Sequence, residues 1–243
     1  MFRVLEICTA NIASAVAAQM AGATRIELCS ELAAGGVTPS VGVIEQVRSR
    51  IDIAINVLIR PRSGDFLYSS DEVESVLRDI AWCSKLGVQG VVVGALTPDA
   101  KVDVDASRQW LKEARSRGLS ATFHRAIDCA ENIFDATEVI ASMGYDRILT
   151  SGGFPTAYEG IENIAKMVQI TSGKGPIIMP GSGVNPDNIR EIITRTKAEE
   201  IHFSASSVYP SGMKVLGGIA KEETLTQSDP LKIKAAIQTL MSL

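Results

Sequence analysis

Near its start the chain reads VLEICTANIASAVAAQMAGATRIELC over residues 4–29. Two short apolar runs, Val4–Cys8 and Arg25–Cys29, each end in glutamate, an aliphatic residue and cysteine. They flank a helix-like segment that ends at Gly22. This pattern is typical of a strand–helix–strand unit whose parallel strands are buried on both faces. Because neighbouring parallel strands end at the same edge of a sheet, we expect two carboxylates and two thiols to converge there.

The same alternation continues along the whole chain. The apolar runs expected to be strands number eight: Val4–Cys8, Arg25–Cys29, Ala54–Ile59, Gly90–Gly94, Ser120–His124, Arg147–Thr150, Ile177–Met179 and Ile201–Ser204. Helix-like segments lie between them, such as Pro186–Thr196, for which Asn185 is the expected N-cap. Eight such units in 243 residues predict an α/β protein with a single (β/α)8 TIM barrel over residues 1–243.

One alternative fold and one irregular segment need to be considered beside the barrel. A doubly wound open sheet is the alternative fold, but it usually has fewer strands and a glycine-rich turn after the first strand. Here the first strand runs into Cys8–Asn11, which contains no glycine. The longest irregular stretch, residues 206–226, is expected to be a mobile or contact-forming loop.

Composition narrows the class of protein. Hydrophobic residues make up 46% of the chain and charged residues 21%, which is enough apolar surface for a large core. A net charge of −4 argues against nucleic acid or an anionic membrane as a partner. Neither a membrane-spanning run nor a signal peptide is recognisable, and the four cysteines are too scattered for a disulfide framework. We therefore expect a cytoplasmic protein.

Charged side chains at the strand ends are candidate catalytic residues. An unpaired charge facing the apolar helix layer would be costly, so Glu6, Glu27, Arg60 and His124 are expected to point into the barrel. A glutamate is then the candidate base and His124 the candidate acid, while Arg60 would stabilise an oxyanion. A purely structural ion pair between Glu27 and Arg60 is the alternative.

The paired cysteines are candidate metal ligands. The two-residue period of a strand places Cys8 on the face of Glu6, and Cys29 on the face of Glu27. Thiolates select soft cations such as Cu(I), whereas carboxylates prefer hard cations. Buried cysteine also behaves as a small hydrophobe, which is the interpretation we favour for two other cysteines, Cys83 and Cys129. A disulfide between Cys8 and Cys29 is geometrically possible, but a reducing compartment disfavours it.

The turns after the later strands are rich in glycine and serine. In many barrels the backbone N–H groups of the last two such turns bind a phosphate group. Together with an arginine after the third strand, these turns supply the candidate anion-binding residues Arg62, Gly152, Gly181, Gly183 and Ser204. The ligand would be a small anionic or phosphorylated metabolite. Alternatively, the glycines serve only to make tight strand-to-helix turns.

Seven stretches resemble the CutC copper homeostasis protein family: Gly22–Ser30, Gly35–Ser40, Ile59–Phe66, Gly94–Asp99, Phe123–Asp128, Asp146–Gly152 and Met179–Asn185. They occur in order between about Leu5 and Ser206. The resemblance implies a cytoplasmic TIM-barrel protein, usually a homo-oligomer, with a role in copper handling. For some members it implies Cu(I) bound through two cysteines, which would be Cys8 and Cys29 here.

The chain departs from the family pattern at a few positions. Thr24 replaces the usual Asp, and Ser182 stands where Gly is common. Ser206 or Ser207 stands where Arg is frequent, which weakens an anion-binding role for the last turn. Two functions follow from the sequence, namely Cu(I) binding through paired cysteines and, as the alternative, an enzyme that acts on a small anionic metabolite.

Overall fold

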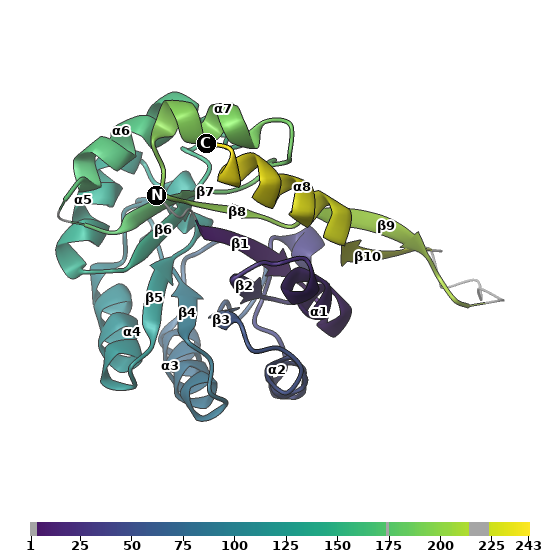
Figure 1. Cartoon of the computed structure of the whole chain (residues 1–243). Coiled ribbons are helices and arrows are strands. Elements are labelled where there is room, and N and C mark those ends of the chain that lie inside the picture. Colours follow the sequence, from purple (N-terminus) through teal and green to yellow (C-terminus); the bar gives the residue numbers. More distant parts are fainter. Residues whose placement is uncertain (1–3, 174, 214–223) are drawn as a thin grey trace.

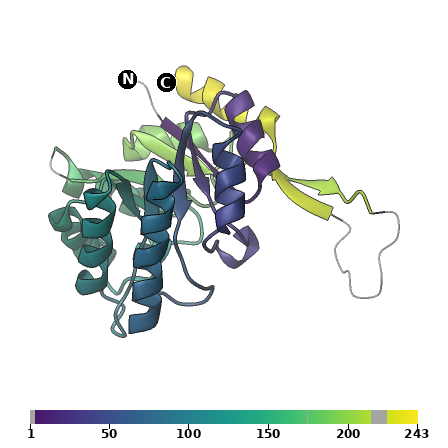
Figure 2. The same cartoon turned by 90° about the horizontal axis from the view of Figure 1, so that it is seen from below.

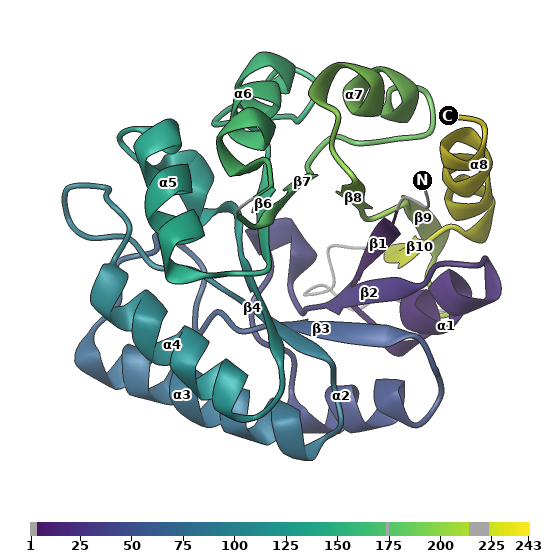
Figure 3. The ribbon, with the colours of Figure 1, turned by 60° about the vertical axis from the view of Figure 1, so that its left-hand side comes forward.

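A computed structural model describes residues 4–173, 175–213 and 224–243. The barrel strands are β1 (Val4–Thr9), β2 (Arg25–Leu28), β3 (Ala54–Leu58), β4 (Gly90–Val93), β5 (Ser120–Phe123), β6 (Arg147–Thr150), β7 (Ile177–Pro180) and β8 (Glu200–Phe203). They pair in parallel in the order β7-β6-β5-β4-β3-β2-β1-β8. The end strands β7 and β8 contact each other, so the sheet forms a nearly closed barrel (Figure 3). The predicted TIM barrel is confirmed.

Helices surround this barrel (Figure 1). They are α1 (Ile12–Met20), α2 (Val41–Arg48), α3 (Ser70–Lys85), α4 (Val104–Ser116), α5 (Ile133–Met143), α6 (Ile161–Thr171), α7 (Ile189–Thr196) and α8 (Pro230–Met241), with short 3-10 helices η1 (Leu32–Ala34) and η2 (Arg125–Cys129). Within the described ranges, no helix is both long and apolar enough to span a membrane.

Local sequence explains most helix boundaries. Helix α3 begins with a capping box, in which the Ser69 side chain accepts from the N–H of Glu72 and the Glu72 side chain accepts from the N–H of Ser69. Helix α7 begins three residues later than expected. Asn185 does cap backbone N–H groups, those of Asp187 and Asn188, but within a turn that precedes the helix.

The strands separate two packing layers. Outward-facing residues such as Ile7, Ile26 and Ile55 form one large apolar core with the helices. A second, small apolar cluster lies apart from it and consists of Cys8, Cys29, Leu58 and Val92. The alternation along each strand also buries a set of charged and polar side chains at inward-facing positions: Glu6, Arg25, Glu27, Asn56, Glu200 and His202.

The segment expected to be an irregular loop is regular at both ends. Strands β9 (Ser206–Pro210) and β10 (Thr224–Ser228) pair in antiparallel fashion and project from the barrel as a ribbon (Figure 2). The sequences of β9 and β10 are short and contain serine or threonine, so neither one predicts a strand by itself. The two segments become strands by hydrogen bonding to each other. The expected loop also includes residues 214–223, which lie outside the described residues.

Candidate functional site

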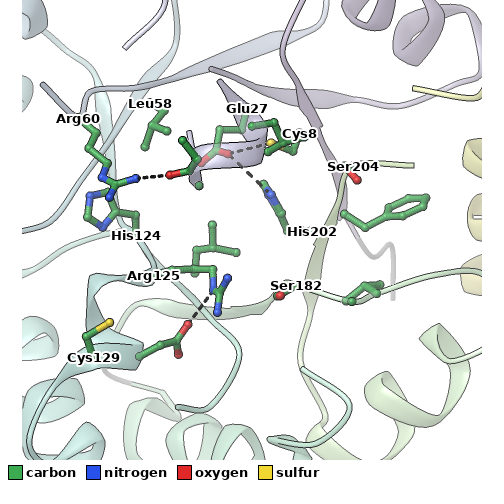
Figure 4. Close-up of a pocket in the computed structure, with 18 of the residues that line it drawn as sticks. Cys8, Glu27, Leu58, Arg60, His124, Arg125, Cys129, Ser182, His202 and Ser204 are labelled. Atoms are coloured by element: carbon green, nitrogen blue, oxygen red, sulfur yellow. Dashed lines mark hydrogen bonds and ion pairs between the residues drawn. The ribbon is translucent and has the colours of Figure 1, made fainter. Parts of the chain in front are cut away.

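A pocket of about 530 Å³ lies where the barrel strands end (Figure 4). Residues from β1, β2, β3, β6 and β8, and from the turns after β2, β3, β5, β7 and β8, form its wall. They include Cys8, Glu27, Arg60, Phe66, His124, Arg125, Cys129, Ser182, Gly183, His202 and Ser204. Its volume suits a small metabolite or a metal ion with additional ligands.

Three potential metal ligands meet in this pocket. The nearest donor atoms of Cys8, Glu27 and His202 all lie within 4.8 Å of one another, and all three residues are buried. The Cys8 thiol donates to Glu27 Oε2 at 3.4 Å, and His202 Nε2 lies 3.7 Å from the same oxygen. Figure 4 shows Cys8 and His202 converging on the Glu27 carboxylate.

The second cysteine lies behind the first. The sulfur atoms of Cys8 and Cys29 are 3.8 Å apart. Cys29 is fully buried and does not line the pocket, because it packs with Leu58 and Val92 inside the barrel. The structure therefore brings the two predicted thiols together but opens only one of them to the pocket.

The strand register shows how this pair is held. Cys8 is the register partner of Glu27, so Cys29, two residues further along β2, is its diagonal neighbour. This register places the two cysteines on the same inward face of adjacent strands, so that one cation could contact both sulfur atoms.

A network of buried charges lies beneath the pocket. Glu6 accepts hydrogen bonds from Arg25 Nε at 2.5 Å, Asn56 Nδ2 at 3.0 Å and His202 Nδ1 at 2.9 Å. Arg25 also pairs with Glu200. Burial works against ionisation of Glu6, but Arg25 and His202 lower its pKa to about 2. Glu6 is thus a fully paired carboxylate that does not line the pocket.

Glu27, His202 and Cys8, which line the pocket, all have pKa values above their usual ones. Burial raises the pKa of Glu27, although the neighbouring His202 opposes this shift. Burial would lower the pKa of His202, but the carboxylates of Glu27 and Glu6 outweigh it and raise that pKa. The contact with the Cys29 sulfur, burial and the charge of Glu27 raise the pKa of the Cys8 thiol well above its usual value.

Arg60 and His124 form the opposite wall. Arg60 does not pair with Glu27, because its terminal nitrogens donate to the carbonyl groups of Ala34, Gly36 and Gly64. The Nδ1 atom of His124 accepts from the N–H of Ala126 at 3.1 Å. The proposed Glu27–Arg60 ion pair is therefore not formed, and both side chains remain part of the pocket wall.

The candidate anion-binding residues do not all meet. Gly183 and Ser204 line the pocket. Arg62 lies in the loop after β3, where it pairs with the carboxylates of Asp65 and Glu72.

Both remaining glycines in this group are placed by close packing. A Cβ atom on Gly152 would lie 2.6 Å from the carbonyl oxygen of Gly160, and one on Gly181 would lie 2.6 Å from the Leu149 side chain. These two positions require glycine for reasons of space.

The other two cysteines differ from each other. Cys83 is buried in the outer core, as expected for a small hydrophobe. Cys129 is exposed, and its side chain lines the pocket from η2. The expectation that Cys129 acts as a buried hydrophobe is wrong, because η2 follows β5 at the rim rather than packing into the core.

Several residues of this site were not predicted from the sequence. His202, Arg25 and Glu200 were not singled out. The two-residue period of a strand puts Arg25 on the same face as Glu27, and Glu200 on the same face as His202. That period was the available indication, although it cannot say which inward residues touch.

Comparison with known proteins identifies relatives over nearly the whole chain. The CutC family model matches residues 3–207. A CutC family protein of Glaesserella parasuis is 41% identical over 239 residues, which cover 96% of this chain and 97% of that protein. The human copper homeostasis protein cutC homolog is 41% identical over 210 residues, which cover 86% of this chain and 76% of that protein.

Solved structures agree with this relationship. CutC from Streptococcus agalactiae matches with a TM-score of 0.77 at 30% identity, over 83% of this chain and 98% of that one. Phosphoribosyl anthranilate isomerase from Thermotoga maritima matches with a TM-score of 0.62 at 13% identity, a likeness of fold alone. From the family match and the relatives together, the chain belongs to the CutC family.

Proposed function

We propose that this protein binds Cu(I) through the sulfur atoms of Cys8 and Cys29. The observation that carries the proposal is their 3.8 Å separation at the base of a pocket. Soft thiolate ligands select Cu(I) over the hard cations that carboxylates prefer. The names of the human and streptococcal relatives refer to copper homeostasis or to CutC and support the same role.

The donor set fits a soft cation. Cys8 lies on β1 and Cys29 directly follows β2, so two neighbouring strands hold the sulfur atoms close together. His202 offers an imidazole Nε2 on the pocket side, since its Nδ1 is held by Glu6. Binding would require the Cys8 thiol to lose its proton, and metal affinity generally depends on such deprotonation.

An anaerobic titration tests the proposal. Cu(I) is added in competition with a chromophoric chelator to the wild type and to Cys8→Ser, Cys29→Ser and Cys83→Ser. Cys83 is the matched control, because it is a buried thiol remote from the pocket. We expect the first two changes to weaken binding by more than about 100-fold, since changes behind a metal site alone cost 10–100-fold. Equal affinity in all four proteins would contradict the proposal.

We further propose a cytoplasmic protein that assembles as a homo-oligomer. The few scattered cysteines, all free among the described residues, support a reducing compartment. Exposed apolar side chains on the projecting ribbon, including Val208 and Leu225, support self-association. Sedimentation of the wild type against Val208→Asp/Leu225→Asp tests this. A monomer in both the wild type and the variant would contradict the proposed self-association.

A second candidate function is catalysis on a small anionic metabolite. It is favoured by Glu27, a pocket-lining carboxyl whose pKa burial raises toward the range useful for proton transfer. Of the two candidate bases, Glu27 suits this role better than Glu6, because Glu6 is paired beneath the pocket. His124 would act as a neutral N–H donor rather than as an imidazolium acid, since its Nδ1 is an acceptor.

Metabolite mixtures monitored by NMR test this candidate. We expect turnover by the wild type that Glu27→Gln abolishes while ligand-induced stabilisation persists. No turnover of any component by either protein would count against an enzymatic role, and unchanged turnover by Glu27→Gln would exclude Glu27 as the base.

A further inference from the structure

Arg60 is a buried cation without a counter-ion in the described part of the chain. Its side chain is 5% exposed, and its contacts are backbone carbonyl groups rather than carboxylates. Its Nε–H has no acceptor among the residues that the structure describes. Because a buried charge without an opposite charge is costly, an anion beside Arg60 would be favoured.

His124 presents a second unpaired donor in the same pocket. Since Nδ1 accepts from the N–H of Ala126, the ring is neutral and its proton lies on Nε2. This Nε2 atom is buried and has no partner among the described residues. Burial and the charge of Arg60 lower the pKa of His124 to about 3, in agreement with a neutral ring.

The fold brings the Arg60 and His124 side chains together. Arg60 follows β3 and His124 follows β5, with Gly94 between them at the end of β4. A Cβ atom on Gly94 would lie 2.6 Å from His124 Nδ1, so glycine leaves the room that the imidazole occupies. The Phe66 ring lies 5.1 Å from the His124 ring and 4.8 Å from the Arg60 guanidinium carbon. Figure 4 shows the imidazole directly beside the guanidinium.

We propose that Arg60 Nε–H and His124 Nε2–H bind the carboxylate of a small organic acid in this pocket. One positive charge and two N–H donors match one negative charge and two acceptor oxygens. A phosphate carries about −1.5 to −2 charges at neutral pH and would remain uncompensated here. The half-buried Phe66 ring packs against both side chains, so we expect it to shift when the acid enters.

This proposal names the ligand class for the second candidate function and rests on that pocket, but not on copper binding. It also separates the carboxylate position from the glycine-rich turns at Gly183 and Ser204. Those turns remain free for another part of the ligand.

The test measures thermal stabilisation by acetate, glycolate and pyruvate at millimolar concentration and constant ionic strength. Acetamide and inorganic phosphate are the counter-probes. The key variant is His124→Asn, because the Asn carbonyl can still accept from the N–H of Ala126 while the Nε2–H donor is lost. Arg62→Ala is the matched control, an arginine of the same loop outside the pocket.

We expect at least one carboxylate to stabilise the wild type and Arg62→Ala equally, and acetamide to have no effect. Loss of a hydrogen bond to a charged group should weaken binding to His124→Asn by roughly tenfold or more. Equal stabilisation of His124→Asn, stronger stabilisation by phosphate, or none by any carboxylate would overturn the proposal.

Two further measurements test carboxylate binding without relying on the fold of a His124 variant or on copper binding. The side-chain Nε2–H resonance of His124 in the wild type should shift on titration with the same acids, and an unmoved resonance would overturn the proposal. The Cys8→Ser/Cys29→Ser protein should bind the acid as the wild type does. Failure of the copper proposal would therefore leave this result intact. If no substrate is turned over, binding of the acid still stands as its own result.

Discussion

His202 Nδ1 lies 2.9 Å from Glu6 Oε1, although the two residues are 196 positions apart in the sequence. This bond orients the imidazole so that Nε2 faces Glu27 and the pocket. Glu6 thus positions a pocket residue without lining the pocket, as a carboxylate hydrogen-bonded to the far nitrogen of a metal-binding histidine does. Because Arg25 is paired with the same carboxylate, the site and the buried charge network share one residue.

Replacing Glu6 should therefore be costly for folding. Glu6→Gln leaves Arg25 partly uncompensated inside the barrel, and breaking a buried ion pair costs about 3–5 kcal/mol. Urea unfolding measures the loss. Glu74→Gln is the control, because Glu74 pairs with Arg78 on the exposed face of α3, where a pair contributes about 0.3–0.5 kcal/mol. Similar losses for both variants would contradict the buried network.

The neutral His124 predicts a pH dependence of stability. Its pKa is about 3 in the folded protein against 6.5 for the free side chain. Below pH 6.5 the unfolded chain gains a proton that the folded protein does not, so the free energy of unfolding falls as the pH decreases from 6.5 to 3. The effect is on the order of 3–5 kcal/mol.

Unfolding of His124→Asn across the same pH range isolates this effect. Asn does not titrate, so the variant should lose less stability than the wild type between pH 6.5 and 3. Glu6 contributes a loss of the same sign near pH 2–4.5 to both proteins. Parallel curves for the two proteins would show that His124 is not buried in its neutral form.

Gly94 should not tolerate a side chain. In Gly94→Ala, the new Cβ would lie 2.6 Å from His124 Nδ1 and 3.2 Å from the Phe123 ring. Overpacking of this kind costs about 1–3 kcal/mol, and the displaced imidazole should also weaken binding of the carboxylate probes. Gly42→Ala is the control, since nothing lies within 4 Å of its Cβ position and it stands in helix α2. That change should be neutral or stabilise by up to about 1 kcal/mol.

The Cys8–Cys29 pair should resist oxidation to a disulfide. Thiol–disulfide exchange requires an accessible thiolate, but Cys29 is fully buried and the pKa of the Cys8 thiol is raised well above its usual value. After mild treatment with oxidised glutathione, mass spectrometry of the unfolded, alkylated protein should find both residues as free thiols. An intramolecular Cys8–Cys29 disulfide formed without loss of the native fold would contradict this expectation.

Much of the architecture is local in origin and was predictable. Apolar runs of three to six residues alternate with amphipathic segments, and this alternation alone indicates strands, helices and their order in a barrel. The two-residue period also predicts that Glu6, Cys8 and Glu27 face inward. These features depend on neighbours in the chain, so the amino-acid sequence by itself determines them.

The partners of those side chains were decided only by the tertiary structure. Closure of the barrel pairs β1 with β8 as well as with β2, which places His202 between Glu6 and Glu27. The path of the loops places carbonyl groups around Arg60, so the expected ion pair with Glu27 does not form and an unpaired donor remains. Such contacts join residues far apart in the chain through strand register and loop conformation, and no local pattern encodes either one.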